Sequence, residues 1–288
     1  MSKELYYLSD FFVGDELCGG AELSDAAIIE HLDIPVNKLR YNKLDSAIKK
    51  DGFYIVSNRS LFSPYDIKKL VKYKNYVVVE HDYQFIIGPG NGRNPYLFKD
   101  AIVPSVWQGQ LEFYKNAKAV FFQTKFQQHL FEINKVEGNF VSMSTTPYSK
   151  EDFKFFREML SYGERPQHRK FAIVDSDKDI KNTEGAVAYC EANKLDYDLI
   201  PSMEREDFLR KLSEYPALVF LPKTPESCCR LVTEARILGL NVITPPTYGA
   251  PHEEWFRLSG LSLVDELERI TLEESIPSMK KYILRGIK

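Results

Sequence analysis

The stretch from Ala217 to Pro246 constrains the fold of this chain more than any other part of the sequence. It opens with five apolar residues, Ala217 to Leu221, which is typical of a strand buried on both faces of a parallel sheet. A helix is predicted next, with Thr224 as its N-cap, Pro225 as its first residue and Gly239 at its end. A second short strand follows. The stretch therefore predicts a strand–helix–strand unit whose ligands bind at the carboxyl ends of the strands.

Two carboxylates lie in the expected helix, Glu226 and Glu234. Eight residues of helix separate them by roughly 12 Å of rise and about 80° of rotation, which is too far for an acid/base pair acting on one bond. The spacing suits a grip on both ends of an elongated ligand with an anionic middle, such as a nucleotide-diphosphate sugar. Its diphosphate would face the free amides around Glu226 to Cys228. The alternative is that Glu226 only stabilises the helix dipole and Glu234 is a solvated residue.

Short apolar runs alternate with helical patterns along the whole chain, which predicts a doubly wound α/β fold. The expected strands are Glu4 to Leu8, Phe53 to Ser57, Tyr76 to Glu80, Ala119 to Phe122, Phe171 to Val174 and Tyr197 to Ile200, and the expected helices include Ala21 to Leu32, Pro64 to Tyr73 and Asn182 to Asn193. A length of 288 residues favours two domains of about 140 residues. We expect them at residues 1–150 and 165–275, with a C-terminal helix at 276–288 that packs back on the first domain.

Gly19-Gly20-Ala21-Glu22 lies where the first expected strand turns into a helix. Glycines at such a turn let backbone amides approach a phosphate. A tight turn with Glu22 as a first-turn acid is the alternative. The motif is not G-x-G-x-x-G, which disfavours a dinucleotide site.

The P-E-S-x6-E-A pattern around Glu226 and Glu234 resembles the E-x7-E signature of retaining glycosyltransferases with the GT-B fold, especially family 4. The N-terminal Gly-Gly-Ala-Glu resembles a motif that often follows the first strand in that family. The resemblance implies two Rossmann-like doubly wound domains facing a central cleft, with the acceptor on the first and the nucleotide-sugar donor mostly on the second. It implies metal-independent transfer without a cofactor, from a donor most often linked to UDP or GDP. Glu226 would then meet the sugar and Glu234 the ribose.

Two further candidates lie in the first half of the chain. His81 follows the expected strand Tyr76 to Glu80, and related glycosyltransferases often have a histidine at a comparable strand end. The resemblance implies that His81 bonds the donor sugar or the acceptor, whereas a lone histidine is more often structural. Arg93 lies in the Gly-, Pro- and Asn-rich stretch Ile86 to Lys99. It either meets an anionic acceptor or is a solvated residue of a surface loop.

Two lysines follow the first strand of the second expected domain, Lys178 and Lys181. Family members usually have an Arg and a Lys there to bind the diphosphate, but this chain has no Arg at that place. The lysines would stabilise the departing phosphate, or they are merely solvated. The full set of candidates is Glu226, His81 and Lys181 for catalysis, Gly19, Gly20, Lys178, Lys181, Thr224, Ser227, Cys228, Glu234 and Gly249 for the donor, and Arg93 and Glu22 for the acceptor, with no metal ligand.

A net charge of −3 gives no global basic field that would argue for nucleic acid. The four cysteines form no C-x-x-C pair, and no Cys/His spacing suggests zinc, so we expect free thiols in a reducing compartment. The N-terminal residues are too polar for a signal peptide, and no apolar run approaches 18 residues. We therefore expect a cytoplasmic protein without a transmembrane segment.

The acceptor stays open at this point. A hydroxyl of a glycan or a lipid-linked glycan is the commonest case in the family, and a hydroxymethylated base of phage DNA is the alternative. Two other classes remain, a non-catalytic protein that binds nucleotide sugars and a nucleotide-sugar epimerase with the same fold.

Overall fold

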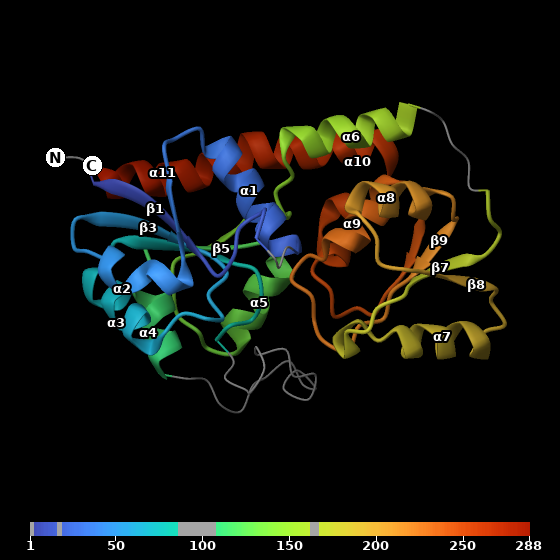
Figure 1. Ribbon diagram of the computed structural model, residues 1–288, viewed down its shortest axis with the longest axis horizontal. Helices are drawn as coiled ribbons and strands as arrows, with labels where there is room; N and C mark the ends of the chain where they lie inside the picture. Colours follow the sequence, from blue (N-terminus) through green and yellow to red (C-terminus); the bar gives the residue numbers. More distant parts are fainter. Residues whose placement is uncertain (1–2, 16–18, 86–107, 162–166) are drawn as a thin grey trace. The chain divides into compact units, whose positions relative to one another are not determined.

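The computed structural model describes residues 3–15, 19–85, 108–161 and 167–288 (Figure 1). The chain forms two compact units. The first comprises Met1–Ser149 and Arg269–Lys288, and the second comprises Lys150–Glu268. Each unit has a parallel sheet with helices on both faces, so the predicted doubly wound α/β class is confirmed.

Six parallel strands form the sheet of the first unit, in the order β2-β1-β3-β4-β5-β6. They are β1 (Glu4–Ser9), β2 (Asn37–Arg40), β3 (Gly52–Val56), β4 (Tyr76–Glu80), β5 (Val120–Phe122) and β6 (Phe140–Ser142). The chain places β2 on one side of β1 and β3 on the other, so the strand order reverses there. Such a reversal is the topological switch point at which ligands bind in doubly wound sheets.

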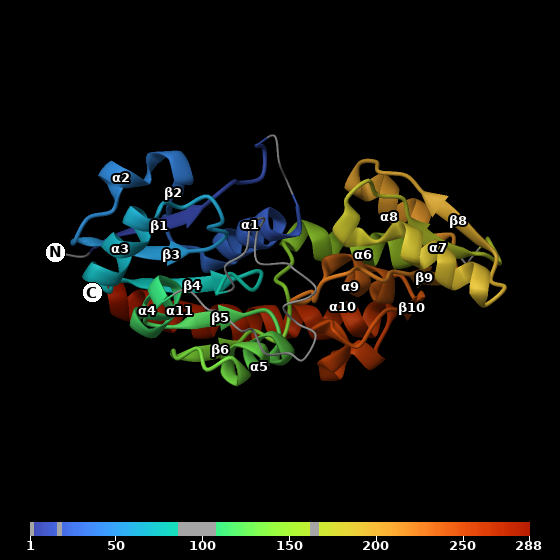
Figure 2. The same ribbon diagram turned by 90° about the horizontal axis from the view of Figure 1, so that it is seen from below.

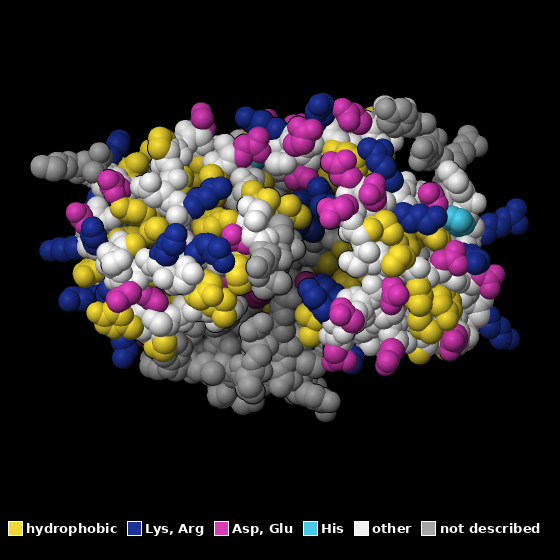
Figure 3. Space-filling model, viewed as in Figure 1, with side chains coloured by type: hydrophobic (Ala, Val, Ile, Leu, Met, Phe, Trp, Pro, Cys, Tyr) yellow, Lys and Arg dark blue, Asp and Glu magenta, His cyan; other side chains and the backbone are white. Residues whose placement is uncertain are grey.

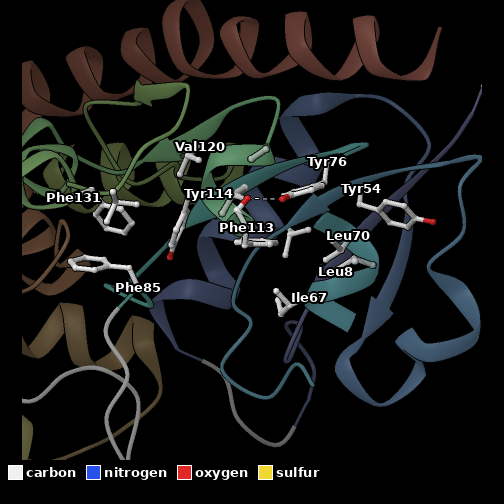
Figure 4. Packing of buried hydrophobic residues seen from close by; sticks show 14 of the residues in the cluster. Leu8, Tyr54, Ile67, Leu70, Tyr76, Phe85, Phe113, Tyr114, Val120 and Phe131 are labelled. Carbon is white, nitrogen blue, oxygen red and sulfur yellow. Dashed lines mark hydrogen bonds between the residues drawn. The ribbon is translucent and has the colours of Figure 1, made fainter. Parts of the chain in front are cut away.

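Both faces of the first sheet are buried under apolar clusters. Because neighbouring residues on a strand face opposite sides, each strand contributes to both clusters. On β3, Tyr54 and Val56 belong to the apolar cluster of Figure 4, whereas Phe53 and Ile55 belong to the cluster on the other face. The first cluster is covered by α2 (Leu44–Ala47), α3 (Pro64–Tyr73), α4 (Gln108–Asn116) and α5 (Lys125–Ile133), and the second by α1 (Gly20–Leu32) and α11 (Ile276–Ile287) (Figures 1 and 2).

The last helix of the chain completes the core of the first unit. Ile276, Met279 and Ile283 of α11 are buried in the cluster that β1, β3 and α1 share. The backbone amide of Lys3 also donates to the carbonyl of Ile287 at 2.8 Å. Truncation of α11 would therefore expose the apolar face of the first sheet.

Four parallel strands form the sheet of the second unit, in the order β10-β9-β7-β8. They are β7 (Phe171–Val174), β8 (Tyr197–Ile200), β9 (Ala217–Val219) and β10 (Asn241–Ile243). Helix α7 (Thr183–Ala192) covers one face, and α8 (Arg205–Ser213) and α9 (Arg230–Ile237) cover the other (Figure 1). The unit also contains α6 (Lys150–Ser161) and most of α10 (Gly260–Arg269).

The helix expected from Pro225 begins later than predicted, at Arg230. Glu226 instead forms a parallel bridge with Tyr248, in which the Glu226 amide donates to the carbonyl of Thr247 and the Gly249 amide donates to the carbonyl of Glu226. These backbone groups are then not available for a helical turn. The prediction that Glu226 and Glu234 share one helix is therefore wrong, and so is Thr224 as its N-cap.

The end of that helix agrees with the sequence. Leu238 is the C-cap and Gly239 follows it with a φ of +86°, a conformation that glycine adopts without steric cost.

Among the helices that the structure describes, none has the length and apolar character needed to span a bilayer.

Candidate functional site

Glu226 and Lys181 form an ion pair at the carboxyl edge of the second sheet. The Lys181 Nζ donates to the Glu226 Oε1 at 3.1 Å, and it also lies 5.3 Å from the centre of the Phe220 ring. Lys181 ends the short turn after β7, and Glu226 lies in the loop after β9. Glu226 is 9% exposed as a residue, and the Lys181 side chain is 30% exposed. Two of the residues predicted to act in catalysis are thus in direct contact.

Cys229 is the N-cap of α9 and adopts a φ of +67°, which is strained for a residue with a side chain. Burial and the nearby Glu226 raise the pKa of the Cys229 thiol well above its ordinary value, although Lys181 acts in the opposite direction. The thiol is therefore uncharged near neutral pH and lies in the surroundings of the ion pair. A cysteine gives no sequence signal for a positive φ, so the sequence did not single out this position.

The other donor candidates of this loop are enclosed by protein. Thr224, Ser227 and Cys228 are 1%, 8% and 0% exposed. The Gly249 amide is taken by the carbonyl of Glu226 at 3.0 Å, and the Gly249 φ of −67° needs no glycine. These residues shape the loop around Glu226, and their direct contact with a donor stays a prediction.

A cavity of about 210 Å³ opens beside the turn after β7. Its wall has two cations and three carboxylates, together with polar groups at the start of α7; the lining residues are Ser176, Asp177, Lys178, Asp179, Asn182, Thr183, Glu184 and Lys223. The Thr183 hydroxyl donates to the carbonyl of Val174 at 2.9 Å and accepts from the Ser176 amide at 3.1 Å, which fixes the turn. The two predicted phosphate lysines therefore lie in different surroundings, Lys178 at the cavity and Lys181 against Glu226.

Acidic residues alternate along the same turn, at Asp175, Asp177 and Asp179. This D-x-D-x-D pattern weighs against the expected metal independence, because carboxylate oxygens suit Mg²⁺ or Mn²⁺. Asp179 is paired with Lys223. Within the part of the chain that the structure describes, no three acidic, His or Cys side chains converge in a way that could hold a metal ion.

Glu234 lies in a cluster of alternating charges formed with Asp152, Arg205 and Arg230. The Arg205 Nη2 and Nε donate to the Glu234 Oε1 at 2.8 and 3.3 Å, and its Nη1 donates to the Asp152 Oδ1 at 2.6 Å. The Arg230 Nη2 donates to the Asp152 Oδ2 at 3.2 Å, and its Nε lies 3.5 Å from the Glu234 Oε1. Glu234 is therefore not the solvated residue of the alternative interpretation, because it is only 5% exposed.

In the first unit, the Glu22 side chain accepts a hydrogen bond from the backbone of the glycine pair that precedes it. Its Oε2 accepts from the Gly19 amide at 2.7 Å, and its Oε1 accepts from the Asn58 side chain at 3.2 Å. Gly19 and Gly20 remain exposed at the start of α1. Glu22 thus holds the turn in place, and its predicted contact with an acceptor stays a prediction. Arg93, the other acceptor candidate, lies outside the described residues.

His81 lies at the carboxyl end of β4 and is bonded to protein at both ring nitrogens. Its Nε2 donates to the Asp25 Oδ1 at 2.7 Å, and its Nδ1 lies 2.7 Å from the nitrogen of the Gln123 side-chain amide. His81 is 6% exposed. Burial alone would lower the pKa of His81, but the charge and hydrogen bond of Asp25 outweigh burial and raise it. A ligand could bond His81 only by displacing one of these partners.

Asp25 is the centre of this buried network, which the sequence did not reveal. Besides His81, it accepts from the hydroxyls of Tyr7, Ser9 and Ser57 at 2.8, 3.1 and 2.6 Å. Its partners lie in β1 and directly after β3 and β4. They therefore come from distant parts of the sequence. Ser57 and Asp25 both face Nε2 of His81, so the three residues do not have the order of a nucleophilic triad.

No protein-family model matches this chain, and no curated protein matches it. Among solved structures, sucrose-phosphate synthase from Thermosynechococcus elongatus is 12% identical, with a TM-score of 0.57 over 99% of this chain and 95% of that chain. HepE from Anabaena in complex with UDP-glucose is 12% identical, with a TM-score of 0.54 over 99% of this chain and 93% of that chain. At this identity the likeness shows the fold, and the chain has the predicted GT-B fold with Rossmann-like sheets.

Proposed function

We propose that the protein is a retaining, metal-independent glycosyltransferase that moves a sugar from a nucleotide-diphosphate sugar to a hydroxyl acceptor. The observation that carries the proposal is the Lys181–Glu226 pair at the carboxyl edge of the second sheet, the edge at which ligands bind in this class of fold. The GT-B fold supports it, as does the UDP-glucose bound by HepE, one of the structures with this fold. UDP or GDP is the expected nucleotide.

The proposed roles follow the charges of the second unit. The first amides of α9, from Arg230 onward, and the ammonium groups of Lys178 and Lys181 would stabilise the negative charge on the departing diphosphate. Glu226 would accept hydrogen bonds from sugar hydroxyls, with Lys181 holding its carboxylate in place. Glu234 would accept from the ribose. Gly19 and Gly20 would bring backbone amides to the donor, and His81 would bond the donor sugar or the acceptor.

The acceptor is proposed to be a hydroxyl of a glycan or a lipid-linked glycan. A hydroxymethylated base in DNA is the alternative, and the charge of the chain favours the glycan. The net charge is −3, and Lys and Arg are interspersed with Asp and Glu on the face drawn in Figure 3. A duplex-DNA substrate would require a strongly salt-dependent association, which a gel shift at 50 and 200 mM salt detects.

A non-catalytic nucleotide-sugar binder is the second candidate, and one observation favours it. The carboxylates of Glu226 and Glu234 are already bonded to Lys181 and Arg205, which lowers their capacity to bond a ligand. Such a protein would bind the nucleotide sugar without hydrolysing or transferring it.

The test is a thermal-shift screen of UDP-, GDP-, ADP- and CMP-sugars, followed by hydrolysis and transfer assays on every sugar that stabilises the protein. We expect stabilisation by a UDP- or GDP-sugar and slow hydrolysis of it, with the anomeric configuration retained. EDTA should leave the rate unchanged. Loss of activity in EDTA that Mn²⁺ or Mg²⁺ restores would contradict metal independence and direct attention to Asp175, Asp177 and Asp179.

A further inference from the structure

Arg205 connects the two carboxylates of the Glu234 cluster, which we define as Asp152, Arg205, Arg230 and Glu234. Arg205 is the first residue of α8, directly after the exposed residues that follow β8. It uses two of its nitrogens on one oxygen of Glu234 and a third on Asp152 in the first turn of α6. A planar guanidinium that bonds in this way fixes the direction of both carboxylates.

The two arginines of the cluster differ in exposure and in contact. The Arg230 side chain is 8% exposed, and its nearest approach to Glu234 is 3.5 Å. The Arg205 side chain is 29% exposed and reaches Glu234 at 2.8 Å. Arg205 therefore makes the shorter bond to Glu234 and is the more accessible of the two, on the side where the chain leaves β8 and enters α8.

Glu234 itself is nearly enclosed, with a side chain that is 7% exposed. A carboxylate at such a place turns toward whatever cation is nearest, because an unpaired buried charge is costly. Without Arg205, the carboxylate would turn toward Arg230 on its own helix. We therefore expect the orientation of the Glu234 carboxylate to depend on Arg205.

We propose that Arg205 is a positioning residue for nucleotide binding, which holds Glu234 in the orientation that accepts hydrogen bonds from the ribose hydroxyls of the donor. This inference rests on the proposed function, in which Glu234 meets the ribose. Arg205 acts through Glu234 and does not itself touch the nucleotide. Its loss should therefore weaken binding of nucleotides that have the ribose diol and spare nucleotides that lack it.

Calorimetry with full-length protein tests this with UDP and GDP, each compared with its 2′,3′-dideoxy counterpart. For the wild type, we expect the dideoxy nucleotide to bind roughly 10- to 150-fold more weakly, the range for losing hydrogen bonds to a charged group. In Arg205→Ala the ratio of the two dissociation constants, dideoxy nucleotide over nucleotide, should shrink toward one. In Glu234→Gln it should also be near one, and adding Arg205→Ala to that variant should not reduce it further.

Arg210→Ala is the matched control, because Arg210 lies on the same helix and packs on Phe155 of α6 without reaching Glu234. Its ratio should equal that of the wild type. If Arg205→Ala does not fold, Arg205→Lys decides the question, since lysine keeps the charge but cannot bridge both carboxylates, and its ratio should also fall. An unchanged ratio in a folded Arg205 variant overturns the positioning role. A wild type that binds none of UDP, GDP and ADP overturns the proposed function, and this inference with it.

Discussion

Polar side chains gather near the carboxyl edge of both sheets, as the Asp25 network in the first unit and as the Lys181–Glu226 pair and the Glu234 cluster in the second, but they differ in how closed they are. In the first unit, Asp25 is 0% exposed, His81 is 6% exposed and both nitrogens of the ring are bonded to protein. In the second unit, the side chains of Lys181 and Arg205 are 30% and 29% exposed. The closed cluster is built to hold strands and helices together, whereas the more open one leaves cations within reach of an anionic ligand. We therefore expect the first network mainly to stabilise its unit, and on the proposed function the cations of the second unit mainly to meet the donor.

Removal of Asp25 should break the closed cluster and produce the largest effect. Asp25→Ala leaves His81 and three hydroxyls without their acceptor, and loss of one partner of a buried pair costs about 3–5 kcal/mol. Urea unfolding measures the change. Glu30→Ala, which removes an exposed carboxylate on the same helix, is the control and should change the free energy of unfolding by at most about 1 kcal/mol, the range for exposed ion pairs. Equal effects in the two variants would mean that the Asp25 network does not stabilise the unit.

Glu226→Gln should do the opposite, with a large effect on activity and a small effect on stability. Loss of a charged hydrogen bond to the sugar costs about 1.5–3 kcal/mol, so donor hydrolysis should slow roughly 10- to 150-fold. The free energy of unfolding should change little, because the partner Lys181 can reach water. Rates from single-turnover hydrolysis check the prediction. Wild-type turnover in this variant would remove Glu226 from the site.

Cys229→Gly tests the strained position between Glu226 and α9. Glycine tolerates the φ of +67° that cysteine adopts there, so the variant should be more stable by about 1 kcal/mol. Cys229→Ala keeps the strain and is the control that accounts for loss of the thiol. Thermal unfolding of the three proteins gives the result. A Gly variant no more stable than the Ala variant would show that the strain is relieved elsewhere.

The pH dependence of stability tests the closed cluster through His81, with the smallest expected effect. Because Asp25 raises the pKa of His81, the folded protein holds the proton more tightly than the unfolded chain does. The contribution of His81 is therefore complete below the unfolded pKa and is lost as the pH rises through the folded pKa. Unfolding followed as the pH rises above the ordinary histidine pKa of about 6.5 should show this decline in the wild type and not in His81→Asn. Burial raises the pKa of Asp10 to about 6, so Asp10 titrates below this interval. A parallel decline in both proteins would contradict the raised pKa.

Local patterns predicted most of the elements. The apolar run Tyr76–Glu80 and the Ser63-capped helix Pro64–Tyr73 have the expected bounds, because strand burial and helix capping are written in adjacent residues. β7 and β8 are likewise as predicted. The short edge strands β2 and β6 were not predicted, since three or four half-buried residues give little periodicity.

The sites were less predictable, because their geometry depends on residues far apart in the sequence. The start of α9 was misplaced since Tyr248, more than twenty residues later, pairs with Glu226. The partners of His81 come from α1, from the end of β3 and from the end of β5, and no spacing connects them. The E-x7-E pattern did identify two carboxylates that the structure buries, but not the cations that hold them.

Hydrogen exchange with and without a saturating nucleoside diphosphate tests the central assignment most directly. We predict that UDP or GDP slows amide exchange in the second unit, in residues 176–184 after β7 and in residues 226–234 around the start of α9. Exchange in the Asp25 network of the first unit should be slow already and unchanged by the nucleotide alone. Protection confined to the first unit, or none in either unit at a concentration that saturates binding, would contradict the assignment of ligand chemistry to the second sheet.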